Sequence, residues 1–119
     1  MINGIGTDII EINRIKEMKQ LDRFVHKLLS PDEQVIYETF KCEKRKIEFL
    51  AGRWAVKEAL YKALGDLCLG ASFHDYVILN TEAGKPYLAH PKIETVHLSI
   101  SHCENYATAF VIYENHQTV

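Results

Sequence analysis

The sequence predicts an α+β protein in which an antiparallel sheet packs against one long buried helix. Three observations support this prediction: β-type patterns lie towards both ends of the chain, an apolar helical pattern runs from Glu43 to Leu64 between them, and 47% of the 119 residues are apolar. This length and composition are typical of a chain that builds one hydrophobic core. We therefore expect a single domain over residues 1–119.

The first element is a predicted β-strand over residues 2–10. Four isoleucines supply its apolar positions, and Gly4 and Gly6 permit another backbone to approach closely. Asp8 stands near the end of this strand. From Glu11 to Leu29 the apolar residues recur with a helical period and basic residues lie between them, so we expect a basic amphipathic helix there.

Two further helices are predicted before the C-terminal strands. Ser30 suits an N-cap, a proline follows at the first helical position, and Glu33 can complete a capping box. This helix should continue through Tyr37. The long helix then begins around Glu43, and Gly65 supplies a plausible C-terminal stop.

The C-terminal part of the chain is expected to be mostly β-structure. Residues 76–79 and 87–88 flank a connection typical of a hairpin, which contains glycine and proline. Residues 96–101 alternate between apolar and polar positions, and residues 106–113 form the last predicted strand. A short turn joins these last two strands.

Composition excludes several classes of protein. A net charge of -2 argues against a general nucleic-acid binder, which is normally strongly basic. Cys42, Cys68 and Cys103 lie far apart and form no C-x-x-C pair, so neither a disulfide framework nor a zinc site is indicated and a reduced, cytoplasmic setting is expected. No signal-peptide pattern and no segment long enough to span a bilayer is present, so no membrane association is expected.

The long helix carries the residues with the clearest chemistry. Glu58 and Lys62 share one of its faces with the small residues Ala51, Ala55 and Gly65. One interpretation is an ordinary i,i+4 ion pair, worth only ~0.3–0.5 kcal/mol on an exposed helix. The other is that the small residues leave room for an anionic ligand, with Glu58 binding Mg²⁺ and Lys62 binding a phosphate oxygen.

Two residues outside that helix are candidates for the same site. Asp8 is a natural second metal carboxylate, but an aspartate at that place also often caps the next helix. His102 follows a strand and can either reach over the sheet edge into a site or bond to nearby backbone. The spacing leaves both alternatives open for each residue.

Taken together, three motifs closely resemble the holo-acyl-carrier-protein synthases, a family of 4′-phosphopantetheinyl transferases. They are Gly4 to Ile12 with Arg14-Ile15, Glu43 to Lys46 with Phe49 to Gly65, and Gly84 to Tyr87 with Val96 to His102 and Tyr106-Ala107. The resemblance implies the 4′-phosphopantetheinyl transferase fold. It also implies Mg²⁺-dependent transfer of 4′-phosphopantetheine from coenzyme A to a serine of apo acyl carrier protein, with release of adenosine 3′,5′-bisphosphate, in support of fatty acid biosynthesis.

The resemblance assigns roles by position. Asp8 and Glu58 would hold Mg²⁺ and, with Lys62, form the catalytic group. The residues implied to bind coenzyme A are Lys44, Arg45, Arg53, Lys62, Gly65 and His102. The general base stays open between a metal-bound water, a carboxylate of the partner and Glu58.

The resemblance also implies two protein partners. An acidic acyl carrier protein would be steered by the basic N-terminal helix, where the implied contacts are Arg14, Met18, Arg23, Phe24 and Lys27. The chain itself is expected to form a homotrimer with sites between subunits. Two rivals remain from the residues alone: a metal-dependent phosphohydrolase acting on a nucleotide, and a binding module whose basic helix grips an acidic protein.

Overall fold

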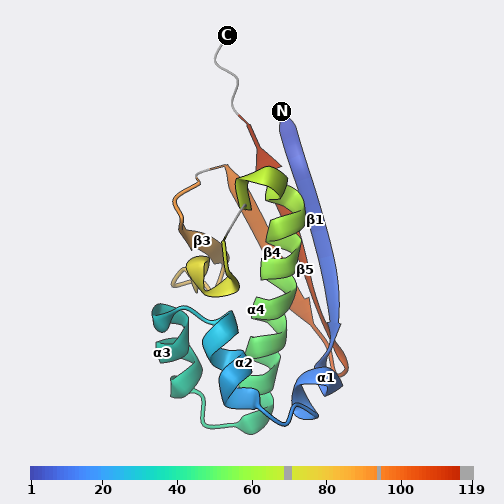
Figure 1. The fold of residues 1–119 in the computed structure, drawn as a ribbon, viewed down its shortest axis with the longest axis vertical. Coiled ribbons are helices and arrows are strands. Elements are labelled where there is room, and N and C mark those ends of the chain that lie inside the picture. The colour runs from blue at the N-terminus through green and yellow to red at the C-terminus, as the bar shows by residue number, and fades with distance from the viewer. Residues whose placement is uncertain (69–70, 94, 116–119) are drawn as a thin grey trace.

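A computed structural model describes residues 1–68, 71–93 and 95–115, and Figure 1 shows how its elements are arranged. Within those residues, one strand and four helices extend to Leu64, and two 3-10 turns and four strands follow. In chain order they are β1 (Ile2–Glu11), α1 (Ile12–Lys16), α2 (Leu21–Leu28), α3 (Pro31–Thr39), α4 (Glu43–Leu64), η1 (Gly65–Cys68), η2 (Phe73–Asp75), β2 (Val77–Asn80), β3 (Pro86–His90), β4 (Val96–His102) and β5 (Tyr106–Glu114).

The predicted fold class is confirmed, with the strands divided between two antiparallel sheets. One sheet has the order β1-β5-β4 and the other is the β2-β3 hairpin. Helix α4 runs along the three-stranded sheet, while α2 and α3 lie beside the N-terminal half of α4 (Figure 1). None of the helices in the described part of the chain combines the length and apolar character needed to cross a membrane.

Close contact between β1 and α4 explains the two glycines of the first strand. A Cβ atom at Gly4 would lie only 1.9 Å from the carbonyl oxygen of Ala63, and one at Gly6 only 1.9 Å from that of Ala59. Both positions therefore require glycine. This contact brings the backbone of β1 directly onto the helix and places Asp8, two residues further along, beside it.

Helix α4 forms the centre of the core. Most of its residues are buried, including Phe49, Val56 and Leu60 as the helical pattern predicts. Ala107, Ala109 and Val111 of β5 are buried as well, whereas their neighbours in sequence point to the other face of the sheet. The sheet thus has one face against α4 and one face turned outward.

The prediction of a single basic helix from Glu11 to Leu29 is wrong. The chain instead forms two short helices, α1 and α2, separated by residues 17–20. The buried residues are Ile12 and Ile15 in α1 and Val25 and Leu28 in α2. In one straight helix Ile12 and Val25 would lie about 140° apart, since each residue turns by about 100°. The break lets both pairs face the same core.

The predicted helix ends are confirmed on α3 and α4. Ser30 and Glu33 form a complete capping box at the start of α3. Helix α4 ends before Gly65, whose φ of 56° is a left-handed value that favours glycine. The C-terminal strands also lie where they were expected, with β2 and β3 forming the hairpin.

Candidate functional site

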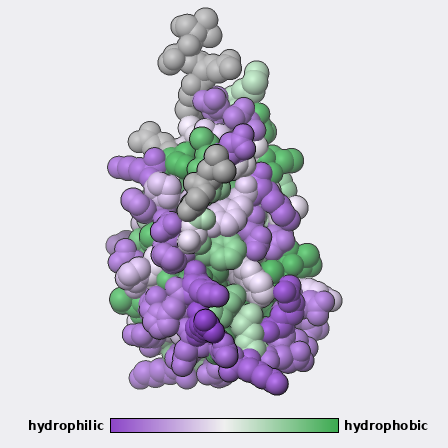
Figure 2. All heavy atoms as spheres, in the orientation of Figure 1, coloured by the Kyte–Doolittle hydropathy of each residue, from purple (hydrophilic) through white to green (hydrophobic). Residues whose placement is uncertain are grey.

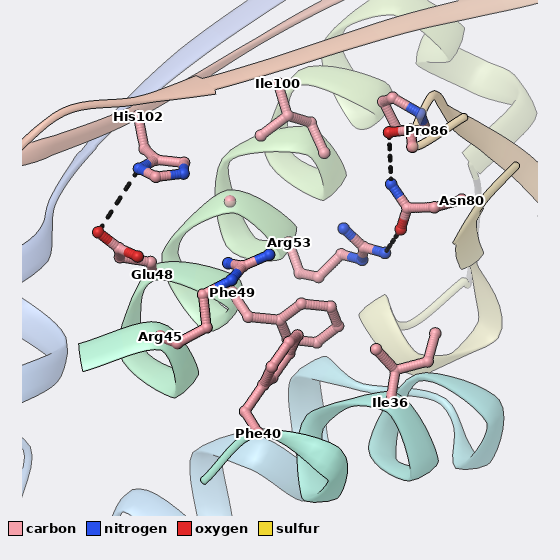
Figure 3. Close-up of a pocket in the computed structure, with 12 residues that line it drawn as sticks. Ile36, Phe40, Arg45, Glu48, Phe49, Arg53, Asn80, Pro86, Ile100 and His102 are labelled. Atoms are coloured by element: carbon pink, nitrogen blue, oxygen red, sulfur yellow. Dashed lines mark hydrogen bonds and ion pairs between the residues drawn. The ribbon is translucent and has the colours of Figure 1, made fainter. Parts of the chain in front are cut away.

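A pocket of about 360 Å³ opens beside the N-terminal half of α4 (Figure 3). It lies between that helix, the end of β4 and the β2-β3 hairpin. Its lining residues are Arg45, Glu48, Phe49, Gly52 and Arg53 from α4, Ile100 and His102 from β4, Asn80, Gly84 and Pro86 from the hairpin, and Ile36 and Phe40 from α3 and its end. The fold thus brings together three of the residues predicted to bind coenzyme A, namely Arg45, Arg53 and His102.

Two guanidinium groups bring positive charge to this pocket, and Glu48 contributes one carboxylate. The guanidinium carbon of Arg53 lies 4.4 Å from the centre of the Phe49 ring, and that of Arg45 lies 4.7 Å from the centre of the Phe40 ring. Burial lowers the pKa of Arg53 to about 10, and the positive charge of Arg45 contributes to this lowering. The negative charge of Glu33 acts in the opposite direction and raises this pKa. Arg53 is therefore still charged at neutral pH, and two cations facing one space favour an anionic ligand.

His102 occupies the end of β4 and turns toward α4. Its Nδ1 atom lies 3.6 Å from Glu48 Oε2, and both side chains line the pocket. Of the two alternatives for this histidine, the structure thus favours the one in which it reaches into a site. Sequence reasoning missed Glu48, although it shares one helical arc with Arg45 and Gly52 at i+3 and i+7 spacing.

Lys44 lies next to the pocket and does not line it. Its Nζ atom forms an exposed ion pair with Glu104 Oε2 at 3.3 Å, which links the start of α4 to the turn between β4 and β5. Gly65 lies at the opposite end of α4. At ~1.5 Å per residue it is about 18 Å along the helix axis from Arg53. Its position is explained by its backbone angle, and a Cβ there would meet no atom within 4 Å.

Asp8 and Lys62 form a second group of functional candidates. Lys62 Nζ donates a hydrogen bond to the carbonyl oxygen of Thr7 at 3.0 Å and lies 3.4 Å from Asp8 Oδ1. Lys62 therefore pairs with Asp8 and not, among the described contacts, with Glu58. The capping alternative for Asp8 is excluded, because the N-cap of α1 is Glu11 and no side chain caps that helix.

Glu58 lies one helical turn before Lys62 and is half-buried. The fold therefore places a second carboxylate near the Asp8–Lys62 pair. Among the described residues no group of three or more His, Cys, Asp and Glu side chains is arranged to hold a metal ion. A pair of carboxylates with room for phosphate oxygens is nevertheless the donor set that suits Mg²⁺, which takes few protein ligands.

The three small residues on the Glu58 face differ in their surroundings. Ala51 and Ala55 are completely buried within the chain and make no room for an anion, whereas a Cβ at Gly65 would meet no atom within 4 Å. The size of the two alanines instead suits a helix that packs closely onto a sheet. The predicted anion-binding residues Arg45 and Arg53 line a pocket elsewhere on α4.

The pocket and the carboxylates lie on different sides of α4. Asp8 belongs to β1 at one edge of the three-stranded sheet, whereas His102 belongs to β4 at the other edge, with β5 between them. Because β1 and β4 are separated by two strand spacings, their backbones lie about 10 Å apart. Arg53 and Glu58 are likewise about 140° apart around the helix at ~100° per residue. One chain thus presents two halves of a candidate site on separate flanks.

The residues predicted to bind a carrier protein gather around α2. Met18, Arg23, Phe24 and Lys27 all line one shallow hollow of about 260 Å³. Arg14 lies apart from this hollow, with its guanidinium 4.7 Å from the centre of a tryptophan ring that Phe24 contacts edge-on. This surface therefore combines basic and apolar side chains on one side of the molecule.

Comparison with known proteins agrees with the motifs. The family model of the 4′-phosphopantetheinyl transferase superfamily matches residues 4–111. A holo-[acyl-carrier-protein] synthase of Anoxybacillus flavithermus is 49% identical over 117 residues, covering 96% of this chain and 97% of that protein. One of Staphylococcus carnosus is 48% identical and covers 96% and 98%.

Solved structures show the same relationship. A holo-(acyl-carrier-protein) synthase from Bacillus anthracis in complex with CoA (3′,5′-ADP) superposes with a TM-score of 0.85 at 43% identity, covering 98% of this chain and 99% of that chain. The Helicobacter pylori enzyme in complex with coenzyme A gives 0.76 at 32% identity, covering 92% and 99%. With its fold, its motifs and these relatives in agreement over nearly the whole length, the chain belongs to the holo-[acyl-carrier-protein] synthases of the 4′-phosphopantetheinyl transferase superfamily.

Proposed function

We propose that this chain transfers the 4′-phosphopantetheine group of coenzyme A to a serine of an apo acyl carrier protein, with Mg²⁺, and releases adenosine 3′,5′-bisphosphate. The observation that carries the proposal is the convergence of Arg45, Arg53 and His102 on one pocket beside α4, in a chain of this family. The holo carrier protein so formed would serve fatty acid biosynthesis. Three free cysteines are in keeping with a cytoplasmic setting.

The pocket is the proposed site for the nucleotide part of coenzyme A. Its two arginines provide charge for phosphate groups, and the rings of Phe40 and Phe49 hold those arginines by stacking. The relative from Bacillus anthracis was solved with CoA (3′,5′-ADP), which carries such phosphates. Lys44 stands beside the pocket, where its ammonium group would add to the attraction of a phosphate.

Asp8 and Glu58 are the residues that would hold Mg²⁺. When bound, the ion would supply positive charge that neutralises the pyrophosphate as the transferred group departs. Lys62 would contribute a second positive charge there, and its present pairing with Asp8 keeps it next to the carboxylates. Gly65 follows the last residue of α4 and has no side chain. The end of the helix near Lys62 would therefore stay open for the ligand.

In this reaction the residues of the chain would act mainly by positioning the substrates and neutralising phosphate charge. The serine hydroxyl attacks the β-phosphorus of coenzyme A, the bond to the bridging oxygen breaks, and the electron pair leaves with adenosine 3′,5′-bisphosphate. Cationic side chains that are fixed beforehand stabilise the charge on the leaving phosphate. The hydroxyl proton passes to a base that is either Glu58, a water or a carboxylate of the carrier.

The carrier protein is proposed to dock on the basic surface around α2. Arg23 and Lys27 flank the hollow, while Met18 and Phe24 provide apolar contact area within it. Arg14 adds a further positive charge on α1, the helix that directly follows β1. An acidic carrier would be drawn to this side of the molecule by the opposite charges.

A homotrimer with sites between subunits is proposed because the outer face of the sheet is apolar and exposed. Ile5, Ile9 and Phe110 are 61%, 60% and 46% exposed on that face. Apolar residues also gather along the β1 edge in Figure 2. A hollow of about 250 Å³ lined by Thr7, Lys62 and Phe110 opens on this side. Because Lys62 also pairs with Asp8, a second copy seated there could bring its own pocket to the carboxylates.

The test is intact-mass spectrometry of apo acyl carrier protein after incubation with residues 1–119 and coenzyme A, with Mg²⁺ or with excess chelator. We expect a gain of one phosphopantetheine per carrier only when Mg²⁺ is present. Consumption of coenzyme A without carrier modification would instead favour a phosphohydrolase. Carrier binding with neither reaction would favour a binding module.

A further inference from the structure

Glu33, in the first turn of α3, is completely buried and lies against two cations. Its Oε1 atom is 2.6 Å from Lys57 Nζ, and its Oε2 atom is 3.5 Å from Arg53 Nε. Glu33 also accepts hydrogen bonds from the backbone N–H groups of Ser30 at 2.9 Å and Ile78 at 3.1 Å. This carboxylate therefore connects α3 with α4 and β2.

Lys57 belongs to the interior of this network. Its Nζ atom donates to Glu33 and also to the carbonyl oxygens of Leu28 at 2.7 Å and Phe73 at 2.9 Å, which uses all three of its donors. Burial lowers the pKa of Lys57, and the charge and hydrogen bond of Glu33 oppose that shift. The charge of Lys57 is thus directed at Glu33 and not at the pocket.

Arg53 extends from the network to the pocket wall. Its Nη2 atom donates to the carbonyl oxygen of Ile78 at 2.9 Å. The same atom donates to Asn80 Oδ1 at 2.8 Å (Figure 3). Asn80 is itself held, because its Nδ2 atom donates to the Gly84 carbonyl oxygen at 3.1 Å. Arg53 Nε is buried without a hydrogen bond beside Glu33, and Nη1 has no protein partner among the described residues.

The network is not balanced in charge. It contains one carboxylate, Glu33, and two cations, Lys57 and Arg53. Buried charges are normally paired. Lys57 is enclosed by its own three acceptors, so the excess positive charge resides on Arg53. The guanidinium of Arg45 lies close enough for its charge to act on Arg53. An anion in the pocket would complete the balance.

We propose that Glu33 and Asn80 are positioning residues that hold the guanidinium of Arg53 in one orientation, with Nη1 free for a phosphate group of the nucleotide. The inference rests on the proposed function, because it takes the pocket as the nucleotide site. Glu33 lies against the guanidinium from the interior and Asn80 from the hairpin. A guanidinium fixed before binding loses little rotamer freedom when the phosphate arrives.

The test is calorimetric titration of the folded protein with adenosine 3′,5′-bisphosphate. Asn80 is exposed at the pocket rim, so Asn80→Ala should fold normally. We expect it to weaken binding roughly three- to tenfold, the cost of ordering one long side chain on binding. The paired substitution Glu33→Gln with Lys57→Met removes one charge of each sign from the interior and should weaken binding by at least the same factor.

The matched control is Asp32→Asn, which removes an exposed carboxylate from the same turn of α3 and should leave the affinity unchanged. Unaltered affinity in Asn80→Ala would overturn the inference while leaving the proposed function in place. A complete lack of binding by the unaltered chain would overturn the proposed function, and the inference with it.

Kinetics separate positioning from a merely structural role. Positioning predicts that Asn80→Ala raises KM for coenzyme A three- to tenfold, with little change in KM for the carrier protein. A structural role would lower the active fraction, and hence kcat, with both KM values unchanged. Asn80→Ala should accelerate hydrogen exchange at the Arg53 Nη2–H group that Asn80 accepts. Asn80→Asp keeps an oxygen acceptor there, so it should restore slow exchange. Equal exchange in both variants would contradict the role of Asn80.

Discussion

Lys62 Nζ lies 3.4 Å from Asp8 Oδ1, across the contact between α4 and β1. The two residues are 54 positions apart in the chain. Their contact depends on Gly4 and Gly6, which let β1 lie directly on the helix. The pair lies on the α4-facing side of β1, one helical turn from Glu58, where the proposed chemistry would take place.

Asp8→Ala and Glu58→Ala are each expected to reduce carrier modification by about 10²–10³-fold, because each removes a proposed metal ligand and charge is decisive in this type of transfer. Both proteins should remain folded, since neither carboxylate is fully buried and a partly exposed ion pair such as Asp8–Lys62 contributes only ~0–1 kcal/mol to stability. The measurement is the initial rate of mass gain on the carrier across a Mg²⁺ titration. Glu38→Ala, an exposed carboxylate on α3, should behave as the unaltered chain; normal turnover in either site variant would exclude the metal assignment.

Glu33→Ala should be among the most destabilising single substitutions in the chain. It leaves Lys57 and Arg53 buried without a carboxylate, and breaking a buried pair in this way costs about 3–5 kcal/mol. Lys57→Met should cost less, because Glu33 then still faces Arg53. Urea unfolding of the two variants measures the order, and the reverse order would show that charge balance does not govern this network.

Gly6→Ala should prevent normal packing of β1 on α4. Its Cβ would lie 1.9 Å from the Ala59 carbonyl oxygen, and backbone on both sides leaves no flexible group to move. We expect a loss of at least ~3 kcal/mol, the upper end for overpacked cores. Gly52→Ala is the matched control, since its nearest neighbour is the Ile100 Cγ2 atom at 3.1 Å, which can move. Similar melting temperatures for the two variants would disprove the predicted close contact.

Reversing the charges of Arg14 and Arg23 together to glutamate should weaken capture of the acyl carrier protein at least tenfold and reduce its dependence on salt. Affinity for coenzyme A should stay the same, because neither residue lines the nucleotide pocket. Binding of each partner is measured separately at two ionic strengths. A parallel loss of coenzyme A affinity would contradict the division of the surface into two sites.

Phe110→Asp should convert the proposed trimer into monomers, because it places a charge in the centre of the exposed apolar face. Sedimentation velocity gives the oligomeric state, and the same samples give the transfer rate. We expect both to fall together, since the pocket and the carboxylates lie on different flanks of one chain. Full activity in a monomeric variant would show that one chain completes the site.

Much of the fold could be predicted because the relevant signals are local. The capping box of Ser30 and Glu33 depends on residues three apart, and the end of α4 depends on the backbone freedom of Gly65. The break between α1 and α2 could not be found in this way. It arises because Ile12 and Val25 must face the same core, which is a property of the packed structure.

By itself, the sequence determined the α+β class, the long helix, the family and the residue types of the site, because helical spacing and contiguous motifs are properties of the chain alone. The tertiary structure decided which of those residues meet. It placed Arg45, Arg53 and His102 around one pocket, joined Lys62 to Asp8 and buried Glu33 between two cations. Contacts between residues far apart in the chain depend on strand order and on the packing of β1 and β4 against α4, which no local pattern specifies.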